Sequence, residues 1–215
     1  MHYPVDPNSP THGMPSCLRV PIAASDIESI EKYVGEIQNI IKGRDSQTKA
    51  LLISPYMAGE PVSPLAKLWQ HADRNDFVKR LYPALQVWVH VDYSSYRKAY
   101  FRFGMPALQD GYVLDHTQNR KAVRLNNYSH PYLRLCPVSR SVNASSGHLL
   151  GTEGMEKANA IADQKSASKR MKRNKFVTSF NIIYASPIDL TKMLNIPTGT
   201  MELPGVARML HQFYV

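Results

Sequence analysis

The residues best able to do chemistry lie between positions 112 and 147, in the stretch YVLDHTQNRKAVRLNNYSHPYLRLCPVSRSVNASSG. Asp115 and His116 stand side by side at the end of a β-like run, and Asn143 follows a second apolar run. Breaking a phosphodiester requires a base that takes a proton from water and a cation that neutralises charge on oxygen. A histidine can be that base, and carboxylate and amide oxygens suit a divalent cation. The pattern therefore predicts phosphodiester chemistry, with ordinary loop polarity as the alternative.

Positioning these groups around one point requires a turn in the chain. Neighbouring side chains on a strand point to opposite faces, so Asp115 and His116 meet one cation only if the strand ends at that dipeptide. In the alternative interpretation His116 caps a strand turn, Asp115 pairs with Arg120 or Arg124, and Asn143 is a turn residue. The two interpretations differ in whether the three side chains converge.

The two runs together resemble the HNH endonucleases, a family whose ββα-metal motif holds one metal ion between two strands and a helix. YVLDH resembles the end of the first strand, and LRLCPVSRSVNASSG resembles the second strand and the start of the helix. The resemblance implies the following roles: His116 as general base, Asp115 and Asn143 as ligands of Mg²⁺ or Mn²⁺, and His148 as a reserve ligand.

The resemblance covers about residues 111–175 and departs from the family pattern at two points. The asparagine that ties the loop between the strands has no clear match, because Arg134 stands at its expected place. The paired Cys-x-x-Cys motifs that bind zinc in many members are absent. These departures leave open a degenerate site on a retained scaffold.

Positive charge points to nucleic acid as a partner, DNA or RNA. The chain carries 26 Lys and Arg against 17 Asp and Glu, a formal net charge of +9, and cations that neutralise phosphates release condensed counterions. Basic residues alternate with aromatic ones over 96–103, which suits phosphate binding and base stacking; the alternative is an amphipathic helix with its rings in the core. The predicted nucleic-acid-binding residues are Arg97, Lys98, Arg102, Arg120, Lys121, Arg124, Arg134, Arg140, Lys169, Arg170, Lys172 and Arg173.

Composition sets the expected compartment. No apolar run approaches the roughly 18 to 20 residues of a membrane helix, and the polar, proline-rich N-terminus has no apolar signal core. Two cysteines, Cys17 and Cys136, are too few for a disulfide framework. We expect a protein of the cytoplasm, in a reducing compartment, with no membrane partner.

Periodicity predicts the elements around the site. Residues 25–43 fit one amphipathic helix, with Ser25 and Glu28 as a capping box and Gly43 at its end. Residues 50–54 and 85–93 fit strands, 63–85 a helix that breaks near Asn75, and 176–184 a strand followed by two short helices. The predicted fold class is α+β: a helical and β N-terminal region, a ββα-metal-like unit, and a short mixed C-terminal region.

Four segments follow from this division: an extended arm at 1–18, an α+β region at 19–110, the HNH-like unit with its basic helix at 111–175, and a C-terminal region at 176–215. The predicted function is a metal-dependent HNH-type endonuclease of a phage, mobile element or bacterial system, with a possible protein partner for the N-terminal region. The first alternative is a non-catalytic DNA- or RNA-binding component of a larger assembly, ribosomal or virion-associated. The second is a regulator using the C-terminal helices, which Pro204 disfavours because proline breaks a helix interior.

Overall fold

The structure is a computed structural model that describes residues 6–8, 19–56, 80–125, 127–144, 180–185 and 187–195. The predicted basic run at 165–175 lies outside these residues, as do residues 63–79 of the helix predicted at 63–85 and the first four residues of the strand predicted at 176–184. Of the N-terminal arm, the structure describes Asp6–Asn8. The buried Asp6 accepts a hydrogen bond from the backbone N–H of Asn181 at 2.5 Å.

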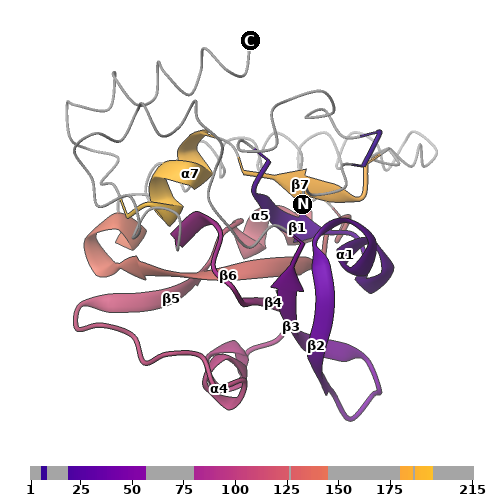
Figure 1. The fold of residues 1–215 in the computed structure, drawn as a ribbon, viewed down its shortest axis with the longest axis horizontal. Helices are drawn as coiled ribbons and strands as arrows, with labels where there is room; N and C mark the ends of the chain where they lie inside the picture. The colour runs from indigo at the N-terminus through magenta and orange to yellow at the C-terminus, as the bar shows by residue number, and fades with distance from the viewer. Residues whose placement is uncertain are drawn as a thin grey trace, which may run out of the picture.

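Within the described residues, the main feature of the structure is a seven-stranded sheet (Figure 1). Its strands lie in the spatial order β2-β3-β4-β6-β1-β7, β5 pairs with β6, and every pairing is antiparallel. The strands are β1 (Pro21–Ala24), β2 (Gly35–Lys42), β3 (Thr48–Pro55), β4 (Gln86–His90), β5 (Tyr112–His116), β6 (Tyr132–Ser139) and β7 (Ile182–Tyr184). The helices are α1 (Ile27–Tyr33), α4 (Tyr96–Arg102), α5 (Arg120–Leu125) and α7 (Pro187–Met193).

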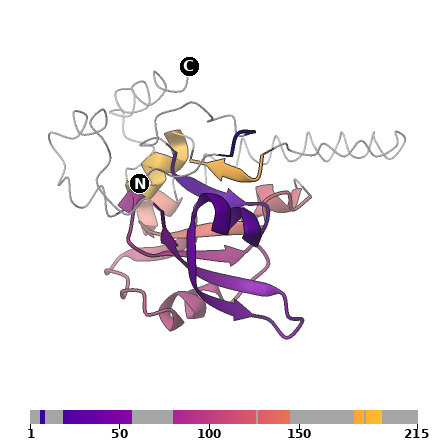
Figure 2. The ribbon, with the colours of Figure 1, turned by 45° about the vertical axis from the view of Figure 1, so that its right-hand side comes forward.

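Strand β6 joins two parts of this sheet. In its first half, Leu133 lies opposite both Ala23 of β1 and Val89 of β4. In its second half, from Leu135 to Ser139, it pairs with β5. The sheet curls around these pairings, with α4 and the β2–β3 turn at one end and β7 and α7 at the other (Figure 2).

The predicted α+β fold class with a separate ββα-metal-like unit is wrong: the described residues form a mostly β structure with a few short helices. β5 and β6 do pair, but β6 is an interior strand flanked by β1 and β4. The physical reason is that the apolar side chains of β6 pack into cores shared with N-terminal strands and with α7. Among the described residues no helix has the length and apolar character needed to cross a bilayer.

The helix predicted over residues 25–43 is wrong in its second half. α1 ends at Tyr33, and the chain continues from Gly35 as strand β2. Gly35 permits this close junction, because a Cβ atom there would lie 2.2 Å from the carbonyl oxygen of Ser54 and 2.6 Å from Cα of Pro55. Sheet pairing with β3 therefore overrides the helical periodicity of the sequence.

An irregularity in β2 explains why its sequence mimics a helix. The register with β3 shifts between Ile37 and Asn39, which is typical of a bulge. Ile37 consequently packs in the core beside α1, while Ile41 packs in the core beneath α4. A strand with this shift shows apolar residues at the spacing expected of a helix face.

The N-terminus of α1 also differs from the predicted capping box. Asp26, not Ser25, is the N-cap residue, and its carboxylate accepts a hydrogen bond from the N–H of Ser29 at 2.7 Å. Ser25 instead donates its hydroxyl to the Asp26 carboxylate at 2.6 Å. The helix start is thus close to the predicted one, but a different side chain fixes it.

The two strands predicted at 50–54 and 85–93 are confirmed as β3 and β4. Every residue of β4 from Gln86 to His90 is buried, so both faces of this strand are covered instead of one. On one side lies a core that includes Trp88, and on the other a core that includes Val87, Val89 and the buried face of α4.

Candidate functional site

The Asp115–His116 dipeptide lies at the end of β5, and its two side chains point to opposite faces of the sheet. Asp115 lies opposite Cys136, which belongs to the core that contains α7 residues. His116 lies opposite Leu135, which belongs to the core beneath α4. Because directly opposed residues share a face, the carboxylate faces α7 and the imidazole faces α4.

Asp115 is held by a lysine that sequence analysis missed. The ammonium of Lys192 in α7 lies 2.5 Å from the Asp115 carboxylate and donates a hydrogen bond to the carbonyl oxygen of His116 at 2.9 Å. The Lys192 side chain is 5% exposed and that of Asp115 27%. The predicted partners Arg120 and Arg124 do not form this pair, and the long sequence separation of Lys192 gave no local signal for it.

His116 is buried, 4% exposed, with its ring edge-to-face against Tyr96 at a centroid distance of 4.6 Å. Its Nε2 atom has no hydrogen-bond partner within the described part of the chain. Burial, followed by the positive charge of Arg120, lowers the pKa of His116 from 6.5 to about 4, against the opposing effect of Asp115. The imidazole is therefore neutral at neutral pH and shielded from solvent.

The remaining predicted ligands do not join this pair. Asn143 is half-buried in a helical segment, 140–144, that follows the far end of the β5–β6 pairing. Tyr112 lies opposite Ser139 at that end, so Asp115 is three residues away, about 10 Å along the strand. His148 lies outside the described residues.

Taken as they stand, these side chains do not fit a resident Mg²⁺ or Mn²⁺ ion. A divalent cation would have to replace the Lys192 ammonium at the Asp115 carboxylate, and His116 faces the other side of the sheet. In the described ranges no group of three or more His, Cys, Asp or Glu side chains is placed to hold a metal ion.

The basic residues of α5 hold the end of β4. Arg120 donates a hydrogen bond through Nε to the carbonyl oxygen of Val91 at 2.7 Å. Arg124 lies 2.9 Å from the Asp92 carboxylate, with both side chains partly exposed. Lys121 is exposed on the same helix. Arg120 and Arg124, both predicted phosphate contacts, are thus engaged within the fold.

Arg134 is buried and holds two segments of the fold together. It is 1% exposed, and its guanidinium donates a hydrogen bond to the carbonyl oxygen of Leu81 at 2.9 Å. It therefore fastens the segment before β4 to β6 and does not present its charge at the surface. Arg140, just after β6, is exposed. The predicted contacts Lys169, Arg170, Lys172 and Arg173 lie outside the described residues.

Helix α4 presents three cations and one aromatic ring to solvent. Arg97, Lys98, Phe101 and Arg102 are all exposed, and the Phe101 side chain is 50% exposed. At 100° per residue these four positions lie on one side of the helix, with Phe101 between Arg97 and Lys98. We call these four residues the α4 face.

The opposite side of α4 anchors it. Ala99 and Tyr100 are buried in the core with β3 and β4 side chains, and Tyr96 and Phe103 pack against the same core. The alternative interpretation of residues 96–103, an amphipathic helix with its rings in the core, is therefore confirmed for Tyr96, Tyr100 and Phe103 but not for the exposed Phe101, and nucleic-acid binding stays a prediction. α4 contains no acidic residue, so nothing on the helix itself neutralises its positive charge.

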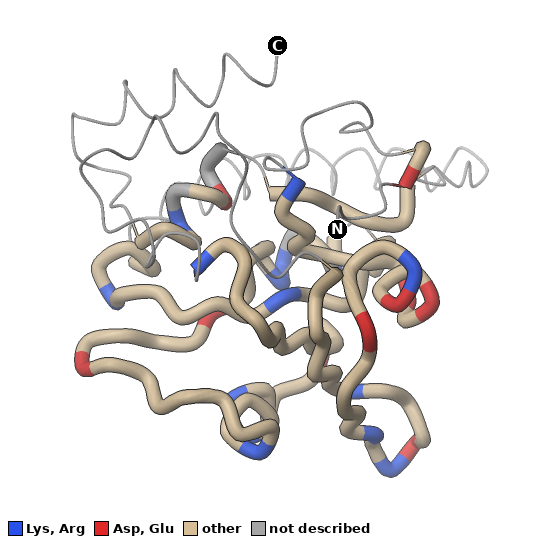
Figure 3. The backbone as a smooth tube through the Cα atoms, viewed as in Figure 1, with Lys and Arg blue, Asp and Glu red and all other residues tan. Residues whose placement is uncertain are grey.

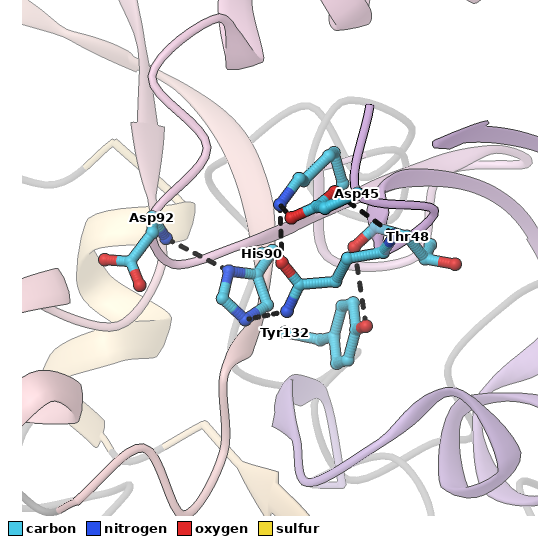
Figure 4. A network of polar contacts seen from close by, with 7 residues as sticks. Asp45, Thr48, His90, Asp92 and Tyr132 are labelled. Atoms are coloured by element: carbon cyan, nitrogen blue, oxygen red, sulfur yellow. Dashed lines mark hydrogen bonds and ion pairs between the residues drawn. The ribbon is translucent and has the colours of Figure 1, made fainter. Parts of the chain in front are cut away.

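A polar network holds the β2–β3 turn against the segment that leads to α4 (Figure 4). Lys49 is ion-paired with Asp45 at 2.8 Å, and the Gln47 side-chain amide lies 3.3 Å from the His90 ring. The other ring nitrogen of His90 lies 3.3 Å from the backbone N–H of Asp92. Burial lowers the pKa of His90, which keeps this ring neutral.

The network places two basic elements at one end of the molecule. Figure 3 shows Lys and Arg positions on α4 and at the β2–β3 turn at this end. At and beside the turn, Lys42 and Arg44 are exposed, and Lys49 of β3 is ion-paired with Asp45. Positive charge at this end of the molecule therefore comes from both the α4 face and the pair Lys42 and Arg44.

Comparison with protein-family models, with curated proteins and with solved structures found no match for this chain.

Proposed function

We propose that this protein is a nucleic-acid-binding protein that contacts its ligand through the α4 face. The observation that carries the proposal is the half-exposed Phe101 ring, flanked on one helix face by Arg97, Lys98 and Arg102. Large aromatic rings are usually buried, and this one lies among cations that cannot pack against an apolar partner without losing hydration. Phosphates and bases satisfy both kinds of group.

The chemistry favours single-stranded segments. Arginine and lysine side chains attract phosphates, and the half-exposed Phe101 ring can stack on an unpaired base. In a duplex the bases are already stacked, so the ring has no equivalent partner. The net charge of +9 adds long-range attraction and raises the rate of encounter with a polyanion.

Hydrolysis by an HNH-type site remains a separate prediction. It requires Asp115 to leave Lys192 and His116 to become accessible, and neither side chain is arranged for this role in the described fold. Membership of a ribosomal or virion-associated assembly likewise stays a prediction. The binding proposal depends on neither.

The test is fluorescence anisotropy with labelled single-stranded DNA, single-stranded RNA and a duplex of the same sequence. Phe101→Ala should weaken single-strand binding about tenfold, because stacking contributes roughly 1–3 kcal/mol per base. Leu85→Ala is the matched control, since Leu85 is also an exposed apolar residue, 38% exposed, but lies before β4.

A second variant tests the charges. The affinity of the wild type should fall as the salt concentration rises. Replacing Arg97, Lys98 and Arg102 by Gln should make the slope of log affinity against log salt less steep by about 2, because each phosphate contact on a single strand contributes about 0.7. Lys32→Gln in α1 controls for the loss of an exposed cation elsewhere. Wild-type affinity in both the Phe101 and the triple variant would refute the proposal.

The same samples test hydrolysis. Incubation with Mg²⁺, Mn²⁺ or EDTA, beside His116→Ala, should leave the nucleic acid intact if the protein only binds. Metal-dependent cleavage that disappears in the variant would establish the nuclease prediction instead.

A further inference from the structure

The outer edge of β2 exposes an apolar side chain. β2 is an edge strand, because within the described residues only β3 pairs with it. Its Ile40 is 41% exposed, which is unusual for a β-branched apolar residue at an edge, where charged residues commonly prevent association.

The backbone of Ile40 offers a hydrogen bond at this edge. Its N–H donates to the side-chain carbonyl of its own neighbour Asn39 at 2.8 Å, in an exposed contact. An N–H of an edge strand that finds a side-chain acceptor in solvent points away from the paired strand, here β3. A carbonyl from another strand can replace the Asn39 acceptor at this position.

The faces of β2 restrict how another strand can pair. Ile40 lies opposite Leu51, so it shares the face of the core beside α1. Asn39 and Ile41 lie opposite Leu52 and Ala50, on the face of the core beneath α4. If the second strand were shifted by one residue, each side chain would lie opposite a residue of the other face. Directly opposed residues in a sheet share a face, so this register is excluded.

We infer that two copies of this chain pair through antiparallel β2 strands, with Ile40 opposite Ile40 of the second copy. In this register Asn39 lies opposite the second copy's Ile41, and the side chains match by face. The two Ile40 side chains cover each other, and each Ile40 N–H bonds to the Ile40 carbonyl of the other copy.

Charge along β2 supports the antiparallel direction. Glu36 lies near one end of the strand, and Lys42 and Arg44 lie at the other; all three are exposed. Antiparallel pairing brings Glu36 of each copy near Lys42 and Arg44 of the other. Parallel pairing would instead place like charges together. Asp45, in the same turn, is already paired with Lys49.

The dimer is expected to be weak and reversible. Its contact is limited to short strands, because the register shift between Ile37 and Asn39 bends the edge. Such a contact is smaller than the roughly 800 Å² per partner of a standard stable interface, so we expect a dissociation constant of about micromolar or weaker.

Sedimentation velocity of the full chain over about 1 to 200 µM tests the inference in this affinity range. The wild-type protein should shift from monomer to dimer with concentration, and Ile40→Lys should remain monomeric. Leu85→Lys, a similarly exposed apolar position outside β2, should dimerise like the wild type. A wild-type protein that stays monomeric throughout, or an Ile40→Lys variant that dimerises equally, overturns the inference.

Cross-linking gives a second, independent measurement of the register. Ile40→Cys places two thiols at a pair with Cα atoms about 5.5 Å apart, within disulfide range. Mild oxidation should give a covalent dimer that exceeds both Leu85→Cys and the wild-type background from Cys17 and Cys136. Equal cross-linking in all three proteins would contradict the pairing, and circular dichroism confirms that each variant is folded.

Discussion

Because His116 is buried, we expect the stability of the fold to decrease as the pH falls. The pKa of His116 is lowered to about 4 in the folded protein, whereas an unfolded chain has the ordinary value of 6.5. Below pH 6.5 the unfolded chain therefore takes up a proton that the folded protein resists. The unfolded state binds more protons, so the free energy of unfolding falls as pH decreases from 6.5 towards 4.

The magnitude follows from the two pKa values. Between about pH 7.5 and about pH 5, the linkage relation gives a loss of about 2 kcal/mol from His116 alone. At a pH low enough for His116 to be protonated in both the unfolded and the folded state, the loss of unfolding free energy approaches about 3 kcal/mol. Because the ring is 4% exposed, solvent screening reduces this little.

Urea denaturation at several pH values, followed by circular dichroism, measures this loss. The comparison protein is His116→Gln, which keeps a polar side chain but does not titrate. The wild type should lose about 2 kcal/mol more than the variant between about pH 7.5 and about pH 5. His90 and His130, whose pKa values are also lowered by burial, remain in both proteins and cancel. Equal losses in the two proteins would refute the argument.

Three further substitutions test individual contacts through urea midpoints. Lys192→Met removes the partner of the Asp115 carboxylate and should cost about 2 kcal/mol, part of which Asp115→Asn in the same chain should restore; no recovery would count against the ion pair. Gly35→Ala should cost about 2 kcal/mol or more, because the new Cβ would overlap the backbone at Ser54. Asp26→Ala should cost about 1 kcal/mol by removing the α1 cap, and an unchanged midpoint would contradict that role.

Local patterns predicted several features that the structure confirms. The strand β3 follows from the apolar run at 50–54 before Pro55, and β4 follows from the alternation of apolar residues over 85–93. Much of the α4 face follows from residues 96–103 alone, because a helix of this sequence places Lys98 and Arg102 on the side opposite Tyr100. In these segments the local preference and the tertiary environment agree.

The helix predicted over 25–43 shows where local evidence failed. The apolar spacing from Ile37 to Ile41 fits a helix and equally fits a strand with a register shift. Only pairing with β3 distinguishes the two, and that information lies in another segment. The close approach of Gly35 to Ser54 is a second long-range fact that a local pattern does not contain.

The dipeptide at 115–116 shows the same limit for function. The groups available for chemistry could be listed from the sequence alone: a carboxylate, an imidazole, and basic residues with interleaved aromatic rings. Their environment depends on the fold, because the pleat of β5 directs Asp115 towards Lys192 and His116 towards Tyr96. Side-chain type is a property of one residue, whereas burial, partner and charge state depend on segments brought together by the sheet.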